Sequence, residues 1–130
     1  MNKMCPCGSS KYYQDCCELY ISGIKVPISP EELMRSRYSA YTIANIEYIA
    51  KTMLGNAIKG FDKEEAVNRA KRVIWQKLEV LNSELVNKFK GFVEFKAHFV
   101  ENNKQCILHE KSEFSRFKDR WYYVDGVVFE

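Results

Sequence analysis

The spacing of apolar residues changes near Trp75 from helical to alternating. Before this residue, apolar side chains recur every three or four positions, which is the spacing of one buried helix face. The pattern predicts three helices, over residues 29–44, 46–53 and 62–74. The first has the clearest start, because Ser29 can cap its free backbone amides and Pro30 suits its first position. Gly55 and Gly60 bracket a predicted loop before the third helix.

After Trp75, apolar and polar residues alternate, as they do in strands that are buried on one face. The pattern predicts four strands, over residues 75–81, 89–100, 105–117 and 120–129. In the first strand, Trp75 is expected to point away from Leu78 and Val80, because successive side chains of a strand face opposite sides. Asn102-Asn103 marks a hairpin turn after the second strand. Helices followed by an antiparallel meander predict an α+β fold, with helices packed on a curved sheet.

A cluster of cysteines precedes the helices. Cys5, Cys7, Cys16 and Cys17 have the spacing C-x-C-x8-C-C. No segment of basic, then apolar, then small residues precedes them, so we expect a cytoplasmic protein. In a reducing compartment such a cluster favours metal binding over disulfides. Four thiolates are the ligand set of a closed, structural zinc site, and soft thiolates suit iron as well.

The residues between the two cysteine pairs favour a bend. Gly8 frees the backbone for a turn, and Ser9 or Ser10 can cap a short helix over residues 11–17 that delivers the second pair of thiols. Residues 18–28 are interpreted as a connector that packs on the main body. We therefore divide the chain into a knuckle with its connector and an α+β domain, covering residues 1–28 and 29–130.

Composition and charge narrow the function classes. A 46% hydrophobic content in 130 residues is enough for the core of one domain with a small appendage. No apolar run approaches the roughly 18 residues that a membrane-spanning helix needs, so membrane insertion is not expected. The formal charge of +3 falls to about +1 once four thiolates and one Zn²⁺ are counted. Acidic and basic residues are also interleaved, so nucleic acid is not an expected partner.

The stretch CPCGSSKYYQDCC resembles the SEC-C motif, a zinc-binding knuckle at the tail of the SecA translocation ATPase and in many small bacterial proteins. The resemblance implies that the four cysteines hold one zinc ion. The motif usually has a glycine where Ser10 stands, so a positive φ at this position would strain the serine. SEC-C knuckles recognise proteins of secretion and synthesis, so the resemblance also implies a protein or ribosome-associated partner.

Further segments resemble a second family over almost the whole chain. They are LMRSRYSAY at 33–41, Trp75, VEFKAHF at 93–99, HEKSEF at 109–114 and RWYYVDG at 120–126. In this order they are similar to the YchJ-like family of bacterial cytosolic proteins, which carry a SEC-C knuckle ahead of the same body. The resemblance implies a nuclear-transport-factor-2-like fold, a cone-shaped antiparallel sheet wrapped over helices. It carries no activity that can be assigned to particular residues.

Cone folds of this type often contain an apolar cavity that some proteins use for ligands. By pattern, the candidate lining residues are Arg35, Tyr41, Glu110, Ser112 and Arg116. Glu110 shares one strand face with Phe114, and if this face is the inner one, its buried carboxylate needs a partner. Arg35 or Arg37 on the first helix is the expected cation. The pair either locks the helix to the sheet or gives a binding pocket its specificity.

These observations predict a zinc-binding adaptor rather than an enzyme. The knuckle is too small for a core of its own, so the metal is expected to fold it and to present a docking surface for a protein or a ribosome. The residues of this surface are Lys3, Lys11, Tyr12 and Tyr13. The alternative is a small-molecule-binding or catalytic cone domain that uses Glu110 and Arg35. For catalysis, no nucleophile, base and orienting group can be placed together from spacing alone.

Overall fold

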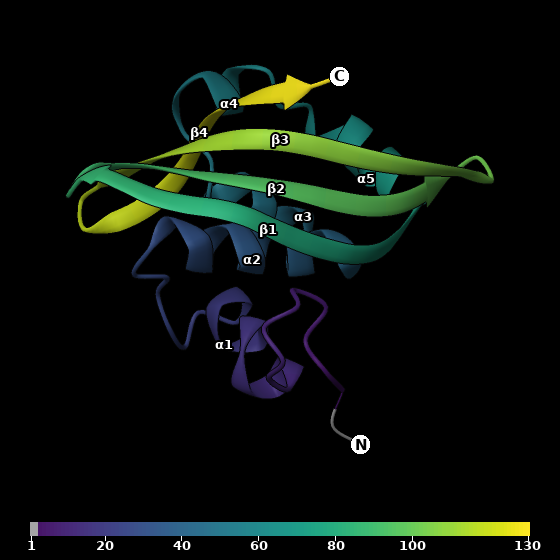
Figure 1. The fold of residues 1–130 in the computed structure, drawn as a ribbon, viewed down its shortest axis with the longest axis horizontal. Helices are drawn as coiled ribbons and strands as arrows, with labels where there is room; N and C mark the ends of the chain where they lie inside the picture. The colour runs from purple at the N-terminus through teal and green to yellow at the C-terminus, as the bar shows by residue number, and fades with distance from the viewer. Residues whose placement is uncertain (1–2) are drawn as a thin grey trace.

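Four consecutive strands and a set of short helices make up the computed structural model, which describes residues 3–130 (Figure 1). The helices are a 3₁₀ turn η1 (Tyr13–Asp15), α1 (Cys17–Ile21), α2 (Pro30–Thr42), α3 (Ile46–Lys51), α4 (Gly55–Lys59) and α5 (Lys63–Ala70). The strands are β1 (Val73–Asn87), β2 (Lys90–Glu101), β3 (Lys104–Phe117) and β4 (Arg120–Phe129). Each strand pairs antiparallel with the next in the order β1-β2-β3-β4. The predicted α+β fold is confirmed.

The start of α2 is the one that the sequence predicts. The Ser29 Oγ accepts a hydrogen bond from the Glu32 amide at 3.1 Å, and Pro30 occupies the first helical position. Two other predictions are wrong. The segment between Gly55 and Gly60 contains the one-turn helix α4 rather than a loop, and the last helix ends at Ala70 because the β-branched residues after it already pair with β2.

A bulge changes the side of β1 on which Trp75 lies. Trp75 pairs with Phe99 and Lys77 with His98, so Gln76 is an extra residue in β1. Because one extra residue reverses the alternation, Trp75 packs against the same core as Leu78. The predicted opposition of these two side chains is therefore wrong. The strand is also longer than predicted, continuing to Asn87 as an exposed ribbon paired with the start of β2.

The core lies between α2 and the inner face of the sheet. Val93, Phe95, Ala97 and Phe99 of β2 are all buried, which confirms their predicted shared face. Leu33 of α2 and Phe114 of β3 are each 1% exposed, and burial of such side chains contributes roughly 1.5–3 kcal/mol apiece. The hairpin after β2 turns on Asn102 and Asn103 with φ of 53° and 63°, the positive values that two-residue turns require.

The N-terminal segment forms a further layer on α2, on the side away from the sheet (Figure 1). Helix α1 packs on α2, and Tyr20 and Ile21 contact the main core. The predicted connector over residues 18–28 is thus helical at its start. Within the described residues, no helix is long and apolar enough to cross a membrane.

Candidate functional site

A small backbone hairpin carries the first cysteine pair. The Tyr13 amide donates to the Lys3 carbonyl and the Cys5 amide to the Lys11 carbonyl, each at 2.8 Å. The backbone of Tyr12 is extended, and the predicted helix over residues 11–17 is present only as the 3₁₀ turn η1, before α1 begins at Cys17. Pairing of the segment with Lys3 and Cys5 competes with helix formation there, since the same amides cannot serve both.

The turn of this hairpin depends on positive φ values. Gly8 has a φ of 82° and Ser10 a φ of 68°. Ser10 therefore has the strain that we expected for a serine in place of the glycine usual in the motif. For a residue with a Cβ, this conformation costs about 1 kcal/mol. Ser9 supports the turn instead of capping a helix. Its Oγ accepts from the Lys11 amide at 3.2 Å and lies 3.1 Å from the Cys16 Sγ.

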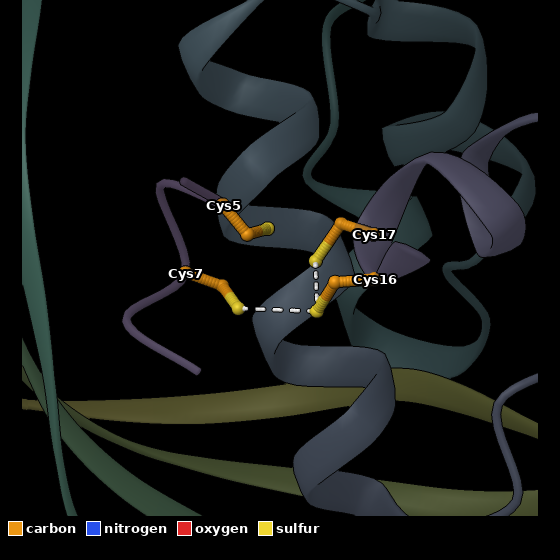
Figure 2. A group of neighbouring side chains, drawn as sticks. All are labelled: Cys5, Cys7, Cys16 and Cys17. Carbon is orange, nitrogen blue, oxygen red and sulfur yellow. Dashed lines mark hydrogen bonds between the residues drawn. The ribbon is translucent and has the colours of Figure 1, made fainter. Parts of the chain in front are cut away.

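The four cysteines of residues 5–17 converge beside α2 (Figure 2). The Cys16 Sγ lies 3.7 Å from the Cys7 Sγ and 4.0 Å from the Cys17 Sγ, and all four sulfur atoms lie within 4.8 Å of one another. In a tetrahedral site with metal–sulfur bonds near 2.3 Å, sulfur atoms stand about 3.8 Å apart, whereas a disulfide requires about 2.05 Å. None of the cysteines is in a disulfide. The cluster can therefore hold a metal ion.

The cysteine cluster is mostly buried, so its thiols are difficult to ionise without a cation nearby. Cys7 and Cys17 are 0% and 1% exposed, while Cys16 is half-buried. The hydrogen bond to Cys5, together with burial, raises the pKa of the Cys17 thiol, and the same hydrogen bond lowers the pKa of Cys5. Four adjacent thiolates become stable only with a cation between them, which fits a metal-binding donor set.

Helix α2 holds the cluster through one stripe of side chains. The Arg35 Nη1 donates to the Cys7 carbonyl at 2.5 Å, and its Nε donates to Glu31 at 3.0 Å. One turn further along, the Ser39 Oγ lies 3.5 Å from the Cys5 Sγ. Arg35 therefore contacts the knuckle, and its predicted place in the cavity of the sheet is wrong. Residues two apart on a helix face nearly opposite sides, so only Arg37 reaches the sheet.

The predicted docking residues differ in exposure. Lys3, Lys11 and Tyr12 are exposed, with Tyr12 at 45%, and all three belong to the two paired segments of the hairpin. Tyr13 is half-buried against the cysteines, and this burial raises its pKa. The exposed part of the predicted docking surface therefore consists of Lys3, Lys11 and Tyr12. We call these three residues the knuckle surface.

A cavity of about 280 Å³ lies between α2, α5 and the sheet. Tyr41, Glu110 and Ser112 line it, as predicted from the pattern. Arg116 does not, because its side chain turns to Asp119 at the β3–β4 hairpin, 3.7 Å away. Half of the remaining lining residues are aromatic: Tyr38, Trp75, Phe95, Phe114 and Tyr123.

Glu110 is held by hydroxyl groups rather than by an arginine. Its Oε2 accepts from the Ser112 Oγ at 2.6 Å and from the Tyr123 hydroxyl at 2.9 Å. The predicted ion pair to Arg35 or Arg37 is wrong, because the Arg37 Nη1 donates to the Ile49 carbonyl and the Thr52 Oγ1 instead. Tyr123 shares the inner face of β4 with buried Trp121, two positions before it, and the bulge at Val124 reverses the alternation only for the residues that follow.

Comparison with known proteins finds relatives with the same order of a cysteine motif followed by an α+β domain. A family model described as YchJ, middle NTF2-like domain, matches residues 29–126, and the SEC-C motif matches residues 1–19. A UPF0225 protein of Serratia proteamaculans is 38% identical over 129 residues, which cover 97% of this chain and 84% of that protein.

Two solved structures share the whole architecture. A SEC-C motif containing protein from Rhodopseudomonas palustris is 34% identical, with a TM-score of 0.88 and complete coverage of both chains. One from Psychrobacter arcticus is 33% identical, with a TM-score of 0.81, over 97% of this chain and 82% of that one. The predicted nuclear-transport-factor-2-like fold is confirmed. The chain therefore belongs to the YchJ family, whose NTF2-like domain here follows a SEC-C motif.

Proposed function

We propose that this protein binds one structural zinc ion through Cys5, Cys7, Cys16 and Cys17, and that the metal-held segment docks a protein or ribosomal partner. The observation that carries the proposal is the convergence of four sulfur atoms within 4.8 Å of one another. Thiolates fill all four positions of a tetrahedral ion, so no position is open to activate a water molecule. The role that fits such an ion is to fix the N-terminal segment on α2.

The identity of the ion is tested by metal analysis of protein purified without added metal. We expect one zinc per chain, because closed four-cysteine sites are the usual form of structural zinc. A Cys106→Ser variant is the control, since this cysteine lies on β3 away from the cluster and should leave the zinc content unchanged. Stoichiometric iron would replace zinc in the proposal, and metal-free protein purified under reducing conditions would contradict it.

The knuckle surface supports docking by its composition and position. It combines two ammonium groups with an exposed aromatic ring, and aromatic side chains are enriched in protein interfaces. Its backbone is held by the hairpin and by the cysteines, so little ordering is needed when a partner binds. SEC-C knuckles of other proteins recognise partners in secretion and synthesis, and this similarity directs the proposal to a protein or ribosome-associated surface.

A double variant, Lys11→Glu with Tyr12→Ala, tests the docking. We expect it to keep its zinc but to lose at least about tenfold in co-sedimentation with purified bacterial ribosomes, because one charge is reversed and one aromatic anchor is removed. The matched control is Lys88→Glu with Phe89→Ala, which changes the same chemistry at the exposed β1–β2 hairpin. Equal co-sedimentation of the two double variants, or none for the wild-type protein, would reject ribosome docking by this surface.

A further inference from the structure

The Glu110 carboxylate lines the cavity, and only one of its two oxygens is hydrogen-bonded by the described residues. Both hydroxyl donors, from Ser112 and Tyr123, bind Oε2. Among the described residues, Oε1 accepts no hydrogen bond, and no cationic side chain lies within 4.0 Å of the carboxylate. Ser112 is 2% exposed, so the charged group is fixed from the interior of the protein.

Gly126 makes room for this carboxylate. A Cβ at this position would lie 2.5 Å from the Glu110 Oε2 and 2.6 Å from the Tyr123 hydroxyl, so a side chain there would displace the pair. Burial, and next the negative charge of Glu110, raise the pKa of Tyr123, which keeps the phenol protonated as a donor. Three positions on β3 and β4 are thus arranged around the Glu110 Oε2, and this arrangement fixes the carboxylate while Oε1 accepts no hydrogen bond from the described residues.

Another part of the cavity wall is aromatic. Trp75 meets Tyr38 with ring centroids 5.8 Å apart and Tyr41 with centroids 5.7 Å apart. The faces of such rings attract cations, most strongly when water is excluded. A flat apolar body therefore fits this wall, and a positive group fits beside it.

The two arginines of the cavity are already engaged. Arg37 donates to the Ile49 carbonyl at 2.8 Å and stacks on the Tyr123 ring at 4.8 Å. Arg69 pairs with Glu101 at 3.5 Å and lies over the Phe99 ring. Arg69 is paired with a carboxylate, and the Arg37 Nη1 is held by two neutral oxygens at the end of α3, whereas the Glu110 Oε1 accepts no hydrogen bond among the described residues. The acceptor that the cavity offers to a ligand is this oxygen.

We infer that this cavity binds a small organic cation, a protonated amine on a flat apolar body. The ammonium group donates to the Glu110 Oε1, and the body lies against Trp75 and Tyr41. The volume of about 280 Å³ is at the lower end for ligand pockets, so the fitting molecules are small, with about ten heavy atoms. This inference does not depend on the metal or on the knuckle surface.

Three size-matched probes test the inference on the full-length, metal-loaded protein. They are 2-phenylethylammonium, the neutral 2-phenylethanol and the anionic 3-phenylpropionate, titrated with NMR chemical shifts as the readout. We expect saturable binding of the ammonium compound with a Kd of about 1 mM, and at least tenfold weaker binding of the other two. Equal binding of all three, preference for the anion, or no saturable shift with any of them would overturn the inference.

A Glu110→Gln variant removes the charge and keeps the acceptor for Ser112 and Tyr123. We expect it to bind 2-phenylethylammonium about tenfold more weakly and to bind 2-phenylethanol unchanged. Glu113→Gln is the matched control, since this residue lies three positions further along β3 and on its other face, 4.0 Å from Lys90. If Glu110→Gln unfolds, Tyr41→Leu replaces it, with a smaller loss for the ammonium probe. Unchanged affinity in the folded variant would also overturn the inference.

Discussion

A Cys7→Ser variant is expected to lose the bound metal and to unfold at a temperature roughly 10–20 °C below that of the wild-type protein. Cys7 is completely buried, and its backbone carbonyl accepts a hydrogen bond from the Arg35 guanidinium of α2. Loss of the ion leaves three thiols without the cation that stabilises their charged form, on the surface of the helix that covers the core. Loss of a structural metal belongs to the class of changes that exceed about 4 kcal/mol.

Thermal unfolding followed by circular dichroism, together with metal analysis, measures this effect. Cys106→Ser is again the control, because its thiol makes one weak contact, to the Lys104 carbonyl at 3.5 Å. Loss of metal with an unchanged melting temperature would mean that residues 1–28 fold independently of the body. The contacts of Arg35 and Ser39 with the cysteine segment lead us to expect the opposite.

An Arg37→Met variant is expected to destabilise the protein by about 2–3 kcal/mol. Arg37 is 6% exposed, and its Nη1 donates to the Ile49 carbonyl at 2.8 Å and to the Thr52 Oγ1 at 2.6 Å. Methionine fills much of the same space but leaves the carbonyl of fully buried Ile49 without this charged donor, and hydrogen bonds to charged groups contribute about 1.5–3 kcal/mol each. The contact with Tyr123 is lost as well.

The urea midpoint of unfolding measures this prediction, with the slope checked for two-state behaviour. Arg72→Met provides the control. Its exposed guanidinium lies 3.6 Å from Glu101, and exposed pairs of this kind contribute less than about 1 kcal/mol. A similar, small shift for both variants would show that Arg37 does not join α2 to α3 and β4.

The sequence predicts those parts of the structure that depend on local chemistry. The start of α2 follows from the Ser29 cap and Pro30, and both act within one helical turn. The alternation of Val93, Phe95 and Ala97 places the inner face of β2 without any knowledge of its neighbours. The four cysteines predict their own convergence, because thiols at this spacing have few other uses in a reducing compartment.

The sequence does not predict which way a side chain faces where a bulge or the orientation of a helix decides it. The bulge near Gln76 turns Trp75 into the core, the bulge near Val124 reverses the faces of the residues after Tyr123, and no residue pattern marks either position. The choice between Arg35 and Arg37 depends on which side of α2 meets the sheet, and the knuckle covers the other side. The aromatic wall and the hydroxyl donors of the cavity could therefore not be assembled from the sequence.

The order of the elements along the chain has a consequence for synthesis. Helix α2 packs on β1, β2 and β4, and the last of these ends about 90 residues after α2. A ribosome that adds about 5–20 residues per second needs roughly 5–20 s for this stretch. For that time the cysteines have emerged while the helix that will cover them has no sheet to pack on. If the cysteines bind a metal as proposed, the thiols meet the available ions before the body closes, and the supply of metals during translation then contributes to which ion is bound.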